Sequence, residues 1–220
     1  MTRVLAVGAH PDDIELGCGG TLLRARRDGA EVTMLVLTDG RRGPGDPGLR
    51  AREQRQAAEY LGAELIVGGF RDGELACGPA LVDRIGEVLA EVRPDLVLTH
   101  APNDSHQDHR AAAEATVAAA RLLSGVLHYE SPSTLEFHPT VFGDVTGLLP
   151  DKLTLLRHHV SQVIGAGRVD LEALAAQARF RGFQGRVTEA EGFSVTRALL
   201  DVRSLAVPGP RYAADAEGLV

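Results

Sequence analysis

The stretch His10-Pro11-Asp12-Asp13 places one imidazole and two carboxylates within four consecutive positions near the N-terminus. Imidazoles and carboxylates are side chains that divalent metals take as ligands, and a carboxylate that is free of the metal can act as a base. Pro11 has a fixed φ and no N–H, so it stiffens the turn and lets His10 and Asp13 converge on one ion while Asp12 points elsewhere. The competing interpretation is an exposed polar turn, and this stretch alone does not decide between the two.

The same residue types recur in the middle of the chain, where the stretch from Thr99 contains His106, Asp108 and His109. Two imidazoles and one carboxylate, with water in the fourth position, form the ligand set of a catalytic zinc site, whereas magnesium prefers mostly oxygen ligands. The cluster could instead only cap a following helix, with Asp108 at the N-terminal end of the helix dipole. Because both clusters carry His and Asp, we expect them to form one zinc site together.

Each cluster directly follows a short apolar run that is typical of a buried strand. Strands and helices alternate in this part of the chain, with strands expected at 4–7, 31–37, 64–67 and 96–99 and helices at 16–28, 49–61, 79–92 and 109–123. This order predicts an α/β, Rossmann-like fold of three layers, in which helices cover both faces of a mostly parallel sheet. No linker divides the chain, so residues 1–220 are expected to form a single domain. The two clusters can meet at the edge where the parallel strands end, if the first and fourth strands are neighbours.

Composition and charge indicate which kind of molecule the protein binds. The net charge is −7 and no run of Lys or Arg exceeds a pair, which argues against a nucleic-acid or anionic-membrane surface and favours a small polar substrate. The N-terminus lacks the apolar segment of a signal peptide, and no apolar stretch approaches membrane-spanning length, so we expect a cytoplasmic protein. Cys18 and Cys77 form neither a CxxC pair nor a disulfide framework, and we interpret both as structural.

At its polar clusters the sequence resembles the LmbE-like, or PIG-L, family of zinc-dependent de-N-acetylases, which includes N-acetylglucosaminyl-phosphatidylinositol deacetylases and deacetylases of the mycothiol and bacillithiol pathways. The motifs that carry the resemblance are Ala9-His10-Pro11-Asp12-Asp13-x-Glu15-x-Gly17-Cys18-Gly19-Gly20-Thr21, Leu37-Thr38-Asp39-Gly40, Arg50-x-x-Glu53, Asp72-Gly73-x-Leu75, Arg93-Pro94-Asp95 and His106-x-Asp108-His109-Arg110. Asp12 would be the general base, His106 would stabilise the oxyanion, and Asp108 would tune a histidine. The zinc ligands that the resemblance implies are His10, Asp13 and His109.

The roles that the resemblance implies are chemically consistent. Zinc lowers the pKa of bound water to about 7, and Asp12 can take the proton as hydroxide attacks an amide carbonyl. An imidazolium at His106 would hold the developing oxyanion, and Asp108 is close enough in sequence to orient an imidazole, although the sequence does not say which one. The predicted function is therefore removal of an acetyl group from an N-acetylated amino sugar. Hydrolysis of another small amide or ester at the same site, or non-catalytic sugar binding, are the alternatives.

The sequence indicates the residues that contact the substrate or another subunit less clearly than it indicates the metal ligands. The family pattern places sugar-hydroxyl contacts at positions comparable to Arg50 and Asp72, but Arg50 could instead pair with Glu53, and Asp72 could belong only to a turn. Family relatives form trimers or hexamers, which implies a homo-oligomer, and the segment from Val141 to Phe193 could serve as an interface or as a rim over the site. A dinucleotide-binding enzyme is disfavoured because the G-x-G-x-x-G spacing that begins at residue 17 fails at residue 22.

Overall fold

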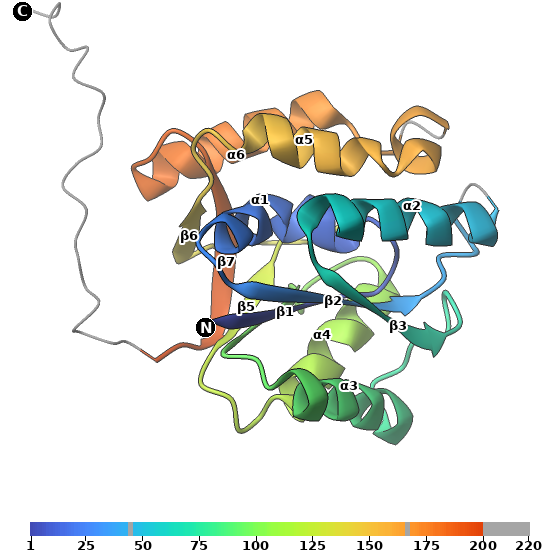
Figure 1. The fold of residues 1–220 in the computed structure, drawn as a ribbon. Coiled ribbons are helices and arrows are strands. Elements are labelled where there is room, and N and C mark those ends of the chain that lie inside the picture. The colour runs from blue at the N-terminus through green and yellow to red at the C-terminus, as the bar shows by residue number, and fades with distance from the viewer. Residues whose placement is uncertain (44–45, 166–167, 200–220) are drawn as a thin grey trace, which may run out of the picture.

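The protein, seen here as a computed structural model, is described over residues 1–43, 46–165 and 168–199, and these residues form one seven-stranded sheet with helices on both faces (Figure 1). The strand order is β3-β2-β1-β4-β5-β7-β6. Strands β3 to β5 in this order run parallel, while β7 is antiparallel to β5 and β6 is antiparallel to β7. The strands are β1 (Arg3–Gly8), β2 (Glu31–Thr38), β3 (Glu64–Phe70), β4 (Leu96–His100), β5 (Val126–Tyr129), β6 (Val141–Asp144) and β7 (Ala190–Arg197).

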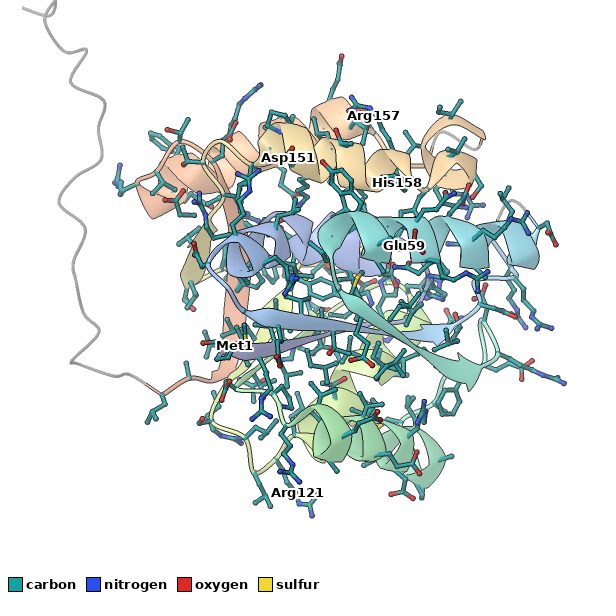
Figure 2. The ribbon with its side chains drawn as sticks, in the orientation of Figure 1. Met1, Glu59, Arg121, Asp151, Arg157 and His158 are labelled. Atoms are coloured by element: carbon teal, nitrogen blue, oxygen red, sulfur yellow. The ribbon has the colours of Figure 1, made fainter. Side chains whose placement is uncertain are left out.

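Helices α1 and α2 cover one face of the sheet and α3 and α4 cover the other, while α5 and α6 lie over α1 and α2 as an additional outer layer (Figure 1). Figure 2 shows the end of α5 at His158 over α2 near Glu59, and the rings of His158 and Tyr60 lie 5.2 Å apart. Over the described part of the chain, no helix combines the length and apolarity needed to cross a membrane. The helices are α1 (Asp13–Arg27), α2 (Pro47–Leu61), α3 (Pro79–Val92), α4 (Gln107–Ala119), α5 (Leu149–Arg157), the π-helical turn η1 (Ser161–Gly165) and α6 (Leu171–Gly185).

The central strands are buried on both faces, which is why their sequences are continuously apolar. Because side chains alternate along a strand, Val4 and Ala6 belong to the core on the side of α1 and α2, and Leu5 and Val7 belong to the core on the side of α3 and α4. This double burial fixes β1 in the middle of the sheet, and the turn that follows β1 is fixed with it.

The neighbouring strands β1 and β4 form the switch point of the sheet. The chain leaves β1 toward β2 and β3, then returns to pair β4 with the other edge of β1, in the register Val4↔Leu96 and Ala6↔Leu98. Ligands of open α/β sheets bind outside the carboxyl ends of the strands at such a point. The condition set by the sequence, that the first and fourth strands be neighbours, is met.

Every strand and helix predicted from the sequence is present, with α3 at its predicted bounds and the others shifted by four residues or fewer at either end. The largest strand error is β3, which continues to Phe70 through two glycines that were expected to end it. Gly68 packs directly against the backbone of Leu37, where a side chain would collide, and the β2–β3 pairing resumes after a bulge at Thr38↔Phe70. The elements after β5 were not predicted individually.

Helix α1 is interrupted at Cys18, whose φ of −144° is not helical. The break frees backbone N–H groups in the next turn, and the Glu191 carboxylate accepts hydrogen bonds from those of Gly20 (2.9 Å) and Thr21 (2.7 Å). Lys152 Nζ donates to Glu191 at 2.5 Å, so the carboxylate is paired as well as hydrogen-bonded. Strand β7 and helix α5 are thereby tied to the helix whose first residue is Asp13.

Candidate active site

The turn after β1 separates two adjacent carboxylates. Asp12 adopts a left-handed conformation (φ 89°) as the N-cap of α1, a conformation that is uncommon outside glycine. The carboxylate of Asp13 folds back onto the turn and accepts the backbone N–H of His10 at 2.7 Å. Thr38 of β2 anchors the turn, since its hydroxyl donates to the Ala9 carbonyl at 2.8 Å. Asp13 therefore faces the histidines, while Asp12 faces Arg50.

Asp13 joins a histidine from each of the two predicted clusters. Its Oδ2 lies 3.2 Å from Nδ1 of His10, and its Oδ1 lies 3.4 Å from Nε2 of His109, with all three side chains buried. Ligand atoms held about 2.0–2.2 Å from a tetrahedral zinc ion lie about 3.3–3.6 Å from one another. Each of the two contacts is close to this spacing, and they use different carboxylate oxygens of Asp13. The donor set of two imidazole nitrogens and a carboxylate also fits zinc better than magnesium.

Other groupings of ligand atoms overlap this trio among the described residues. His10 and His109 each belong to two of these groups. Asp13 belongs to one group, together with His109 and His100, and the sequence analysis did not identify His100 as a candidate. Nε2 of His100 lies 3.1 Å from Asp13 Oδ2 and accepts the Ala9 N–H at 3.1 Å. The groups that could hold a metal are His10, His106 and His109; Asp13, His100 and His109; and His10, Asp72 and Asp108.

Asp108 contacts the ring of His10 and orients it. Its Oδ2 lies 3.1 Å from Nε2 of His10, and it is fully buried and accepts the backbone N–H of Gly73 at 2.6 Å. Asp72 Oδ1 lies 3.2 Å from the same Nε2, and its Oδ2 accepts the Arg42 N–H at 2.6 Å. Burial lowers the pKa of His10, but Asp108, Asp13 and Asp72 together raise it to about 12. Without a metal, His10 therefore carries a proton on both ring nitrogens. A bound metal would displace the proton of Nδ1, which is the nitrogen on the Asp13 side, while Nε2 would keep its proton toward Asp108.

Asp104 makes the equivalent contact with His109 and was missed by the sequence analysis. Its Oδ2 lies 3.2 Å from Nδ1 of His109 and accepts hydrogen bonds from the hydroxyls of Ser131 (2.8 Å) and Thr134 (3.1 Å), and only 2% of Asp104 is exposed. Burial raises the pKa of Asp104, but the bonds to His109 and to the His106 N–H hold it well below its usual value. The available signal was an Asp in the loop that precedes the second cluster.

His106 is a neutral imidazole rather than the imidazolium expected from the sequence. It is the N-cap of α4, where its Nδ1 accepts the backbone N–H of Asp108 at 3.2 Å, so that nitrogen carries no proton. Burial, and then the positive charges of His109 and His10, lower the pKa of His106. Its ring stacks on His109 with 4.6 Å between centroids, and it lines the cavity. A neutral ring can still donate from Nε2.

Arg50 is hydrogen-bonded to the backbone of the turn that contains Asp12 and to the loop after β2. It is 4% exposed, and its guanidinium donates to the carbonyls of Gly40 (2.5 Å) and Pro11 (2.8 Å) while lying 3.7 Å from Asp12 Oδ1. The alternative partner considered from the sequence, Glu53, instead accepts the N–H and hydroxyl of Ser161 at 2.8 and 2.6 Å, so that interpretation of Arg50 was wrong. Burial, and then the charge of Asp13, raise the pKa of Asp12 to about 7.

A cluster of three buried polar residues, Glu15, Gln54 and His159, supports this turn. Gln54 accepts the Asp12 N–H at 3.2 Å and donates to Glu15 at 2.7 Å. His159 lies 3.1 Å from the same Glu15 oxygen. No pattern in the sequence indicates that His159, far along the chain, contacts a residue of the first helix.

A cavity of about 320 Å³ opens over these residues. Its lining includes the proposed ligands, Asp12 and His106, together with Gln162, Arg168 and Val169 from the segment that precedes α6. Of the two roles predicted for the segment from Val141 to Phe193, the structure therefore shows a rim over the site. Arg50 and Asp72 also line the cavity.

The PIG-L family, described as GlcNAc-PI de-N-acetylase, matches residues 5–120 of this chain. The chain is 37% identical over 167 residues to the uncharacterized deacetylase YaiS of Escherichia coli, a match that covers 72% of this chain and 90% of YaiS. It is 30% identical over 189 residues to the diacetylchitobiose deacetylase of Thermococcus kodakarensis, covering 74% and 70% of the two chains. The crystal structure of the conserved protein TT1542 from Thermus thermophilus superposes with a TM-score of 0.82 at 31% identity, covering 92% of this chain and 98% of that one. The matched region contains both polar clusters, and the chain belongs to the PIG-L family of de-N-acetylases.

Proposed function

We propose that this protein is a zinc-dependent hydrolase that removes the acetyl group from an N-acetylated amino sugar. The observation that carries the proposal is the separation of the two carboxylates at the turn. Asp13 contacts His10 and His109, while Asp12 lines the cavity beside Arg50 and contacts neither histidine. The names of the relatives support the reaction, since one of them is a diacetylchitobiose deacetylase.

His10, Asp13 and His109 are the residues that would hold the metal. When bound there, zinc would supply an activated water and polarise the amide carbonyl. The chain's contribution is to fix the ligands, because Asp108 and Asp104 each hold the outer nitrogen of one histidine.

Asp12 is the proposed general base. Arg50 and Gln54 hold its turn, so its carboxylate can take the proton of the attacking water and later return it to the departing amine. His106 donates from Nε2 to the carbonyl oxygen as negative charge develops on it.

Arg50 and Asp72 face the cavity, and contact with sugar hydroxyls remains a prediction for both. In the structure both side chains already have partners within the protein. Arg50 donates to two backbone carbonyls, and Asp72 contacts His10 and accepts the Arg42 N–H. We extend the proposal to a cytoplasmic protein that forms a homo-oligomer. Light scattering on the purified protein would test the oligomeric state.

The experiment measures amine release from a panel of N-acetylglucosaminides and N-acetylated amino acids. We expect activity with the sugars, its loss after treatment with a chelator, and its return on addition of zinc. Release only from the amino acids would favour the alternative of another small amide, and sugar binding without any amine release would favour a binding protein. Either result would overturn the proposal.

A further inference from the structure

Two arginines, Arg42 and Arg168, line the cavity. Arg42 follows β2, and its backbone N–H is bonded to Asp72. Its guanidinium lies on Gly73, because a side-chain carbon placed on that glycine would fall 2.5–2.7 Å from the guanidinium atoms. Arg168 comes from the segment before α6, where its backbone N–H donates to the Gln162 carbonyl at 3.1 Å. Both side chains are exposed.

Neither guanidinium has an ionic or hydrogen-bonding partner among residues 1–43, 46–165 and 168–199. Arg50, the third arginine of the cavity, binds two carbonyls and lies beside Asp12. The other two carboxylates of the cavity are also engaged, since Asp13 contacts three histidines and Asp72 contacts His10. The cavity is therefore lined by two exposed arginines whose positive charges have no partner among the described residues.

These charges oppose the sign of the whole molecule, whose net charge is −7. A neutral sugar would leave both guanidinium groups unneutralised, whereas a carboxylate or phosphate would pair with them. Arginine matches the geometry of both anions through paired N–H donors. An exposed arginine is often only solvated, but here two arginines from distant segments line the same cavity as the proposed catalytic residues.

We infer that the substrate carries an acidic group, a carboxylate or a phosphate, on the part of the molecule beyond its N-acetylated sugar, and that Arg42 and Arg168 bind this group. The inference rests on the proposed function and narrows its substrate class. It makes the two arginines specificity-determining residues of the site.

The test compares three N-acetylglucosamine derivatives with the zinc-loaded protein: the glycoside of glycolic acid, the glycoside of glycolamide, and N-acetylglucosamine 1-phosphate. The first two differ in charge but little in shape. We expect kcat/KM for the acid to exceed that for the amide by about tenfold to a hundredfold, the usual contribution of hydrogen bonds to a charged group. The phosphate arm shows which of the two anions the site prefers. Added salt should reduce kcat/KM for the acid more than for the amide.

The variants are Arg42→Gln and Arg168→Gln, each of which should reduce the acid-to-amide ratio of kcat/KM. The matched control is Arg41→Gln, because Arg41 is exposed, adjacent to Arg42 and already paired with Asp39 at 2.6 Å. The control should keep both rates and their ratio. Equal kcat/KM for charged and neutral derivatives would overturn the inference, as would a preference for the anions that survives in the double variant.

Failure of the proposed function gives a different result. If the protein releases amine neither from these three derivatives nor from the panel of N-acetylglucosaminides, the deacetylase proposal is wrong, and the dissociation constants of the same acid and amide then decide the role of the arginines. Tighter binding of the acid that is lost in the double variant would support the inference, and equal binding would overturn it.

Discussion

Nε2 of His10 lies 3.1 Å from Oδ2 of Asp108, although the two residues are 98 positions apart. The contact shows which histidine Asp108 orients, a question that the sequence left open, and it directs Nδ1 of His10 toward Asp13. Asp104 holds His109 in the same manner. Each histidine proposed as a ligand is thus held by a buried carboxylate on its outer nitrogen, which is how metal-binding histidines are commonly fixed.

The role of Asp104 predicts the behaviour of Asp104→Asn. The amide keeps the shape of the side chain but loses the charge that holds His109, so zinc affinity should fall by about tenfold to a hundredfold. The measurement is competition for zinc with a chelator of known affinity. The control is Asp83→Asn, at an exposed position of α3. Wild-type zinc affinity in Asp104→Asn would show that this carboxylate does not support the ligand.

The buried pair of Lys152 and Glu191 predicts a large loss of stability on removal of one partner. Lys152→Met would leave the Glu191 carboxylate buried without its cation, which typically costs about 3–5 kcal/mol in the free energy of unfolding. Arg27→Gln removes one partner of the exposed pair with Asp151 and should cost less than about 1 kcal/mol. Urea unfolding of both variants tests the contrast, and equal losses would contradict it.

His128 predicts a dependence of stability on pH. Burial lowers the pKa of this histidine, whose Nδ1 donates to the His100 carbonyl at 2.7 Å. The unfolded chain therefore binds a proton near pH 6.5 that the folded chain does not, so this residue reduces stability as the pH falls below that value. His128→Gln should be less stable than wild type at pH 8, but the difference should shrink at pH 5.5. Urea unfolding at the two pH values measures it, and a difference that grows toward acid pH would contradict the assignment.

The sequence was most informative where a local pattern determines the structure. Continuous apolar runs predicted the central strands, and the polar residues that follow two of them predicted where the site lies. The pairing of β1 with β4 depends on the direction of the crossovers, which the local pattern does not contain, so the meeting of the two clusters could be stated only as a condition.

The supporting residues could not be found in the same way. Asp104, His100 and His159 lie close to the proposed catalytic residues only because loops and helices from distant parts of the chain pack together. The region after β5 gave weak signals, since β6 has four residues and β7 is buried only in its first half. From the same region, α5 nevertheless packs on α1, and the segment before α6 supplies Gln162, Arg168 and Val169 to the lining of the cavity.

The adjacent residues Asp12 and Asp13 provide the sharpest test of the site. Asn tolerates the left-handed conformation of position 12, so Asp12→Asn should keep the fold and most of the zinc. It should lose deacetylation by about a hundredfold to ten-thousandfold, the usual share of general acid–base catalysis. Asp13→Asn should instead weaken zinc binding, because Asp13 contacts both His10 and His109, and its activity should partly return at high zinc.

Zinc content and turnover are measured for both variants on whichever N-acetylated sugar the wild type accepts, with Asp28→Asn at the exposed end of α1 as the control. Because Asp12 and Asp13 are chemically alike and neighbours in the chain, any difference between the variants reports their positions in the site. Loss of zinc in Asp12→Asn with full zinc in Asp13→Asn would reverse the two assignments. Near-normal turnover in Asp12→Asn would show that the water is activated without this base, and the proposed mechanism would then be wrong.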